Sequence, residues 1–154
     1  MRSIAAMIQE MWKEGKCPLI DGVLFDDGRL FACKYKRVEI RGMSGFSAEI
    51  PDKKPSAIES AIDMNVDFSE IDPSFVAIDA GNGIKYSCGE GGFGGDGFVS
   101  CSSLPDDHLY WIAFFQRSNP FDDITINKHE IIARNNLGHL WRFSIEDPTD
   151  IHVA

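Results

Sequence analysis

Short strand-like runs fill the chain from residue 75 to residue 145 and limit its possible folds more than any other feature. Each run is rich in aromatic or β-branched residues, and most are bounded by Gly, Pro, Asn, Asp or Ser, as β-strands are. The seven runs lie at 75–78, 85–88, 98–101, 109–117, 124–127, 131–135 and 139–145. Consecutive strands joined by such short turns predict a sheet that is mostly antiparallel.

The run 110–115 identifies the centre of this sheet. It reads Tyr-Trp-Ile-Ala-Phe-Phe and is apolar on both faces, because successive side chains of a strand point to opposite sides. It therefore predicts a central strand covered on both faces, by a helix on at least one of them. Asn136, Leu137 and Gly138 separate the last two runs and predict a hairpin turn in which Gly138 has a positive φ.

Two helices are predicted outside the strand-rich region. The first lies between Ser3, a suitable N-cap, and Gly15, a suitable stop. Its apolar residues recur at spacings of three and four: Ile4, Met7, Ile8, Met11 and Trp12. The second is predicted at 57–64, because Ser56 and Glu59 match the reciprocal capping pattern of a helix start. A chain of 154 residues is expected to form one domain, spanning 1–154, here an α+β fold of mostly antiparallel β-sheet with both helices packed on it.

A further strand is predicted at 29–41. Its apolar residues occupy odd positions up to Tyr35 and even positions from Val38 onward. This change of face predicts a bulge or break near Lys36 and Arg37. The basic residues of the strand are interpreted as a solvated face.

The charge is concentrated in one third of the chain. The sequence has 24 acidic and 15 basic residues and a net charge of −9. Residues 59–107 contain ten acidic residues and a single base, Lys85, and so account for the whole imbalance. The shortage of Lys and Arg argues against nucleic acid as a direct partner and favours a basic protein. The alternative is a solvated acidic surface that maintains solubility.

Eight carboxylates of this acidic third are the candidate partner-binding residues. The sequence predicts that they contribute to one electronegative face on the second helix and the strands that follow it. They are Asp63, Asp67, Glu70, Asp72, Glu90, Asp96, Asp106 and Asp107.

The glycine-rich string 91–99 lies in the middle of the acidic third. It reads Gly-Gly-Phe-Gly-Gly-Asp-Gly-Phe-Val and fits one copy of a nine-residue calcium-binding repeat. A solitary copy lacks half of its ligands, because successive repeats share each ion. The alternatives are a glycine loop joining two strands and a loop that moulds against a partner. Glu90 and Asp96 would repel phosphate, and no Lys-Ser or Lys-Thr pair ends the string, so it is not a phosphate-binding loop.

No sequence motif for catalysis or metal binding is present. The four cysteines form no Cys-x-x-Cys pair, and the four histidines form no His-x-x-x-His or Glu-x-x-His pair. A Gly-x-Ser-x-Gly nucleophile motif is also absent. The sequence therefore predicts free thiols, no catalytic residue, no metal ligand and no cofactor, and favours a binding protein over an enzyme.

The apolar stretches of the chain are too short for a membrane protein. The longest near-apolar run, 109–115, is far shorter than the roughly 20 residues that cross a bilayer. Gln9 and Glu10 interrupt the N-terminal apolar stretch before it reaches the length of a signal-peptide core. We therefore expect a cytoplasmic protein without membrane contacts.

Two segments of the C-terminal third carry a family resemblance. They are Tyr-Trp-Ile-Ala-Phe-Phe-Gln-Arg-Ser-Asn-Pro-Phe at 110–121 and Ala-Arg-Asn-Asn-Leu-Gly-His-Leu-Trp-Arg-Phe at 133–143. Both resemble sheet segments of bacterial immunity proteins from contact-dependent inhibition and related toxin systems. The resemblance implies an antitoxin that binds and neutralises one cognate toxin domain, often a nuclease with a basic face. These families share no active-site motif, so no functional residue is transferred.

The sequence leaves a second functional class open. A small-molecule or Ca²⁺-binding β-rich module without catalytic activity is the alternative to an immunity protein.

Overall fold

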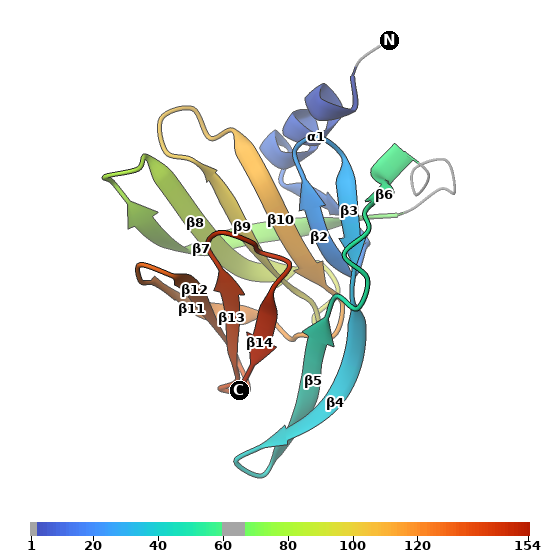
Figure 1. The fold of residues 1–154 in the computed structure, drawn as a ribbon, viewed down its shortest axis with the longest axis vertical. Helices are drawn as coiled ribbons and strands as arrows, with labels where there is room; N and C mark the ends of the chain where they lie inside the picture. Colours follow the sequence, from blue (N-terminus) through green and yellow to red (C-terminus); the bar gives the residue numbers. More distant parts are fainter. Residues whose placement is uncertain (1–2, 60–66) are drawn as a thin grey trace.

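The strands of the chain form three antiparallel sheets, and a helix covers one of them (Figure 1). This description covers residues 3–59 and 67–154 of the computed structural model. The helix is α1 (Ile4–Lys13). The strands, in chain order, are β1 (Lys16–Pro18), β2 (Gly22–Phe25), β3 (Arg29–Ala32), β4 (Lys34–Ile40), β5 (Met43–Glu49), β6 (Ser56–Ala57), β7 (Phe68–Asp79), β8 (Ile84–Gly91), β9 (Gly97–Ser103), β10 (Leu109–Phe115), β11 (Phe121–Ile126), β12 (Glu130–Asn135), β13 (Leu140–Ser144) and β14 (Ile151–Val153).

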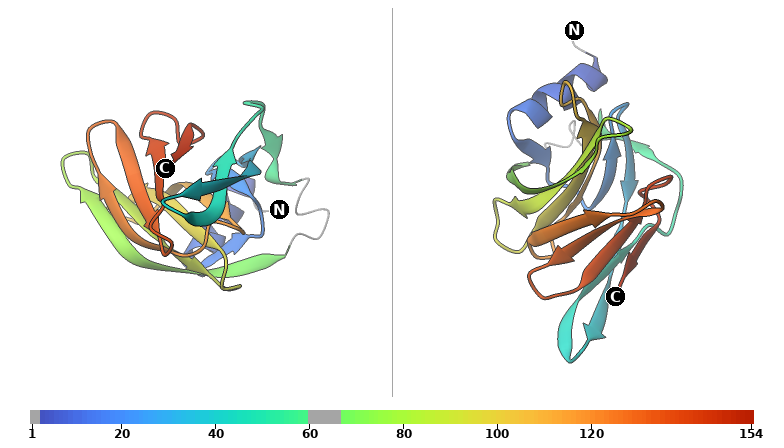
Figure 2. Two further views of the ribbon diagram at one scale, coloured as in Figure 1. Left: turned by 90° about the horizontal axis from the view of Figure 1, so that it is seen from below. Right: turned by 90° about the vertical axis from the view of Figure 1, so that its left-hand side faces the viewer.

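The largest sheet has eight strands in the order β1-β7-β8-β9-β10-β2-β3-β6. A smaller sheet contains β11 to β14 as consecutive hairpins, and β4 and β5 form a two-stranded arm that extends away from the rest of the molecule (Figures 1 and 2). All seven strands predicted between residues 75 and 145 are present as β7 to β13. Gly138, with a φ of 84°, makes the turn between β12 and β13. The prediction of a mostly antiparallel β-sheet is therefore confirmed.

Helix α1 begins and ends where the sequence predicts. The Ser3 hydroxyl accepts a hydrogen bond from the backbone N–H of Ala6 at 3.1 Å, which satisfies one of the free donors of the first turn. Ile8, Met11 and Trp12 are buried against the large sheet. Gly15, with a φ of 70°, turns the chain from α1 into β1. No helix within residues 3–59 and 67–154 is long and apolar enough to cross a bilayer.

Strand β10 lies at the centre of the large sheet, between β9 and β2. Ile112 and Phe114 are fully buried in the cluster that contains the apolar residues of α1. Trp111, Ala113 and Phe115 point to the opposite side and pack against the four-stranded sheet. The central strand is thus covered by a helix on one face and a second sheet on the other, as its apolar sequence predicts.

Aromatic side chains fill the space between the two sheets. The Phe115 ring centroid lies 4.8 Å from that of Trp141, and the Trp141 centroid lies 5.6 Å from that of Phe121. Phe143 joins this group at 6.2 Å from Phe115. Tilted and edge-on contacts of this kind stabilise a core beyond the burial of the rings alone. The two segments that carry the family resemblance therefore supply core residues of the scaffold.

The predicted strand at 29–41 is divided differently from the prediction. It breaks at Cys33, between β3 and β4, and β4 pairs with β5 in one continuous register from Lys34 opposite Glu49 to Ile40 opposite Met43. The predicted bulge near Lys36 and Arg37 is therefore wrong. The arm leaves the large sheet, and Tyr35, Val38 and Ile40 of β4 are only partly buried, so their change of face needs no backbone irregularity.

The predicted second helix is not confirmed. Ser56 and Ala57 form β6 and pair with Leu30 and Arg29 of β3, and within the described residues only Ile58 and Glu59 of the predicted helix are helical. The Ser56 hydroxyl donates to the carbonyl of Leu30 at 3.4 Å. Residues 60–64 of the predicted helix lie outside the described residues.

Candidate protein-binding surface

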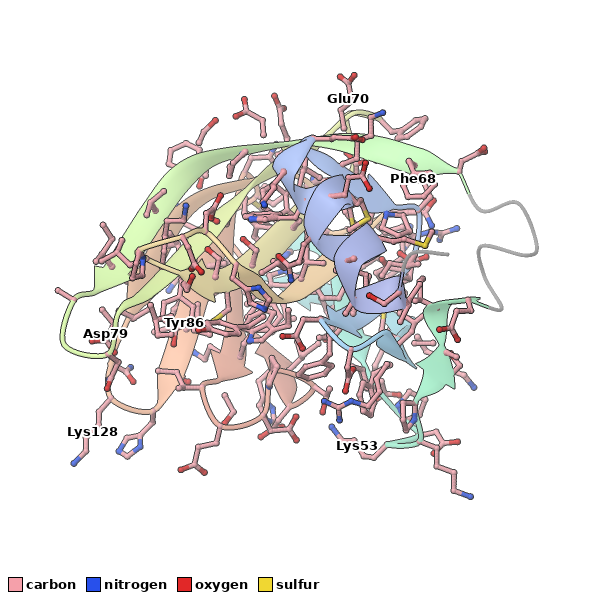
Figure 3. The ribbon with its side chains drawn as sticks, turned by 90° about the horizontal axis from the view of Figure 1, so that it is seen from above. Lys53, Phe68, Glu70, Asp79, Tyr86 and Lys128 are labelled. Atoms are coloured by element: carbon pink, nitrogen blue, oxygen red, sulfur yellow. The ribbon has the colours of Figure 1, made fainter. Side chains whose placement is uncertain are left out.

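Strand β7 places several of the candidate carboxylates on one side of the sheet. Along its first half, Phe68, Glu70 and Asp72 are exposed and alternate with buried Ser69 and Ile71. Figure 3 shows Glu70 pointing away from the body of the protein. Exposed residues at alternate positions share one face of a strand.

Glu90 joins this group through the pairing of β7 with β8. It lies opposite Asp72 in the antiparallel register, and directly opposed residues have side chains on the same face of the sheet. Asp67 precedes β7 and is exposed, and its backbone carbonyl accepts a hydrogen bond from the N–H of Leu19 at 2.7 Å. We refer to Asp67, Glu70, Asp72 and Glu90 as the acidic face.

The acidic face is not neutralised by neighbouring bases. In the part of the chain that the structure describes, none of its four carboxylates forms an ion pair. Lys16 lies opposite Glu70 in the register between β1 and β7, but its Nζ atom is 3.9 Å from a carboxylate oxygen of Glu14 instead. Like charges directly opposite each other, as at Asp72 and Glu90, destabilise a sheet. This arrangement therefore favours the binding of an external cation or a basic protein.

The glycine-rich string forms the loop between β8 and β9 and is fixed on both sides. The N–H of Gly92 donates to the Ser69 hydroxyl at 2.8 Å, and the carbonyl of Gly95 accepts from the N–H of Asn119 at 2.9 Å. These bonds hold the loop beside the start of β7. Phe93 lies at its tip with 67% of its surface exposed.

Asp96 does not contribute to the surface. Its side chain is 2% exposed, and one carboxylate oxygen accepts from the N–H of Phe93 at 3.3 Å. The other oxygen has no hydrogen-bond partner within the described residues. A Cβ atom at Gly91 would lie 2.3 Å from this carboxylate, so the glycine leaves space for it. Asp96 therefore shapes the loop and cannot contact a protein partner in this conformation.

Asp106 and Asp107 lie in the turn between β9 and β10, at the opposite end of the sheet from Glu70. Asp107 forms an ion pair with Lys85, its Oδ1 atom lying 2.8 Å from Nζ. Asp106 accepts a hydrogen bond from the Ser103 hydroxyl, which lowers the pKa of the Asp106 carboxyl below its ordinary value. The structure therefore separates this pair from the acidic face. Asp63, the remaining candidate, lies outside the described residues.

Exposed apolar residues also occur in the second half of β7 and were not among the predicted binding residues. Phe75, Val76 and Ile78 are 40%, 47% and 55% exposed. The sequence analysis treated the run 75–78 only as a strand of the scaffold. The flanking residues Pro73 and Asp79 were the available signal, because proline and charge are typical of sheet edges.

One cavity and the possible metal-donor side chains bear on the alternative of a small-molecule or Ca²⁺-binding module. A cavity of about 290 Å³ lies between α1 and the first residues of β7, and its walls include Met7, Met11, Leu24 and Phe68. Within residues 3–59 and 67–154, no group of three or more His, Cys, Asp or Glu side chains is arranged to hold a metal ion.

The thiols are free, as the sequence predicts. Burial raises the pKa of Cys101 to about 12, and burial together with the nearby carboxylate of Asp123 raises the pKa of Cys88 to about 12. Thiols with such pKa values are poor nucleophiles at neutral pH.

The chain matches no protein-family model, no curated protein and no solved structure. A functional assignment therefore rests on the chain's own geometry and charge.

Proposed function

We propose that this protein is a cytoplasmic immunity protein that binds and neutralises a basic toxin domain through the acidic face. The observation that carries the proposal is the placement of Glu70, Asp72 and Glu90 together on one side of the sheet, where none of them forms an ion pair with another described residue. Two exposed aromatic side chains lie nearby: Phe68 at the start of β7 and Phe93 in the loop between β8 and β9. Aromatic anchors next to charged groups are typical of protein interfaces.

A nuclease is the toxin class that this surface fits best. An enzyme that binds nucleic acid must present Lys and Arg side chains to the phosphate groups. Unpaired carboxylates in a comparable array would attract that basic surface, accelerate association and discriminate against other partners. The cytoplasmic location belongs to the same proposal, because such a toxin acts inside the cell and because all four cysteines are free thiols.

A growth-protection assay tests the proposal directly. The polypeptide encoded immediately upstream of this chain's gene is expressed alone and together with the chain. We expect the polypeptide to stop growth and the chain to restore it. We expect the triple variant Glu70→Lys, Asp72→Lys, Glu90→Lys to fail to restore growth, because the variant repels a basic toxin.

The matched control changes the net charge by the same amount elsewhere. Glu39, Glu49 and Glu146 are exposed and lie outside the acidic face, and their replacement by Lys should leave protection intact. A neighbouring polypeptide that does not harm cells, or equal loss of protection in both triple variants, would contradict the proposal.

A further inference from the structure

The second half of β7 is an unpaired sheet edge. Strand β1 pairs with β7 only from Phe68 to Glu70. The last backbone hydrogen bond along this edge joins the N–H of Ile71 to the carbonyl of Gly15 at 2.9 Å. Among the residues that the structure describes, no strand pairs with residues 72–79 on the side of β7 away from β8. The backbone groups on this side of β7 are therefore available to another strand.

The exposed side chains in the middle of this edge are apolar, whereas protected sheet edges usually carry charged side chains. Phe75, Val76 and Ile78 expose 40% to 55% of their surfaces. Natural sheet edges are usually protected against pairing with other chains. Here Asp79, Pro73 and the register irregularity between Asp72 and Phe75 provide such protection toward the ends of the segment. The apolar stretch between them is an exposed edge to which a partner strand can add.

A hollow lies beside this edge. A cavity of about 260 Å³ is lined by Trp12 and Lys13 of α1, by Pro73 and Val76 of β7, and by Ser87 of β8. Gly15, which ends the pairing along this edge, also lines the cavity, so the hollow lies on the helix-facing side of the unpaired segment. A strand added here would extend the eight-stranded sheet.

The two faces of the edge differ in charge. Phe75 and Ala77 lie opposite Cys88 and Tyr86, which are buried between the two sheets, so these positions and Asp79 face the four-stranded sheet. Asp123 of β11 adds negative charge on this side, since burial and its nearby carboxylate together raise the pKa of the Cys88 thiol. The sheet-facing side of the edge therefore carries carboxylates beside Phe75 and Ala77.

The helix-facing side of the edge is apolar, and Lys85 and Lys13 lie near it. Val76 and Ile78 lie opposite Ser87 and Lys85. Lys85 is paired with Asp107, and Lys13 lines the adjoining cavity. An added strand therefore gains from Lys or Arg on the face toward the four-stranded sheet and from apolar residues on the face toward α1.

The same strand of a second copy does not meet this requirement. Residues 73–79 contain no Lys or Arg and therefore cannot supply the basic face. They would instead add the carboxylate of Asp79 to an edge that already carries carboxylates.

We propose that the toxin docks by adding one of its own strands to the edge of β7, from Pro73 to Asp79. The added strand carries Lys or Arg on one face and apolar side chains on the other. This inference rests on the proposed function and specifies the partner segment and its mode of binding. Backbone hydrogen bonds fix the strand, and the acidic face next to it attracts the remaining basic surface of the toxin.

A short capped peptide of alternating Lys and Val is the probe, tested against the full chain by amide hydrogen exchange. We expect the peptide to slow exchange of the β7 amides at 75–79 on the order of tenfold, because they acquire hydrogen-bond partners or lose contact with water. A peptide of alternating Glu and Val should protect them much less, and the fully N-methylated Lys–Val peptide should not protect them.

Two exposed apolar positions provide the matched variants. Ile78→Lys adds a charge on the edge and should abolish the protection, whereas Met43→Lys, at the tip of the arm and 44% exposed, should not change it. Unchanged exchange at 75–79, equal protection by the Glu–Val peptide, or a dimer of the free chain that Ile78→Lys dissociates would each overturn the inference. The growth assay with the acidic-face variants tests the proposed function separately, so the two proposals fail on different measurements.

Discussion

At the scale of single residues, the structure divides the eight candidate carboxylates into groups with different roles. Glu70, Asp72 and Glu90 are exposed on one face and form no ion pair with other described residues. Asp96 is buried within a loop that it helps to shape. The sequence revealed the density of negative charge but not this division, because local sequence does not show whether a turn aspartate points into the loop or out of it.

Asp106 has a pH dependence that its hydrogen bond determines. The Ser103 hydroxyl donates to the Asp106 carboxylate and lowers its pKa in the folded state. A carboxyl whose pKa is lowered by folding stabilises the protein above its unfolded-state pKa, and this contribution is lost as the pH falls through the folded-state pKa. Asp106→Asn should therefore lower stability at neutral pH, and the difference from the unmodified chain should vanish in strong acid.

Urea unfolding across the acidic pH range, with the Asp106 carboxyl pKa followed by NMR, measures both effects. Ser103→Ala should move this pKa upward toward its ordinary value. A pKa that does not change in Ser103→Ala would show that the hydrogen bond does not control it.

At the scale of elements, one side chain docks α1 onto the central strand. The Gln9 amide donates to the carbonyl of Leu109 at 2.8 Å and accepts from the N–H of Leu109 at 2.8 Å, so it pairs with the start of β10 as a neighbouring strand would. Leu109 is fully buried, so its backbone groups would lack partners without this amide.

Gln9→Leu should therefore lower the free energy of unfolding by about 1–3 kcal/mol, the usual cost of leaving buried backbone groups unpaired. Gln9→Glu keeps the acceptor for the Leu109 N–H and should lose less. Chemical denaturation of both variants provides the comparison, and a Leu variant as stable as the unmodified chain would exclude this role.

Helices and strands with strong apolar patterns were predictable from the sequence. Strands that exist only because they pair with a strand elsewhere in the chain were not. Strand β10 and helix α1 carry periodic apolar residues, so they were identified together with the layers that cover β10. Strand β1 is only three residues long and is defined by its pairing with β7, which is distant in sequence. Ser56 was predicted to cap a helix, but it pairs with Leu30 of β3, and its hydroxyl donates to the Leu30 carbonyl.

At the scale of the whole molecule, the fold divides the acidic third of the sequence between two ends of one sheet. The hairpin of β7 and β8 brings Glu90 opposite Asp72, whereas the β9–β10 turn carries Asp106 and Asp107 to the other end. Asp72, in the acidic face, and Asp79, at the other end of β7, are separated by six residues, a distance of roughly 20 Å along the strand. In Figure 3, Lys53 and Lys128 lie on the side of the molecule opposite Glu70. The sequence could not reveal this polarity, because it depends on strand order.

The central claim is that the acidic face attracts a basic toxin, and the association rate tests it most directly. Stopped-flow mixing of the chain with the toxin domain encoded upstream gives this rate at low and near-physiological ionic strength. We predict that Glu70→Lys, Asp72→Lys, Glu90→Lys slows association on the order of tenfold or more at low salt, and that added salt reduces the difference. The control triple at Glu39, Glu49 and Glu146 should change the rate by less than about twofold. Equal association rates for both triple variants at low salt would contradict the account.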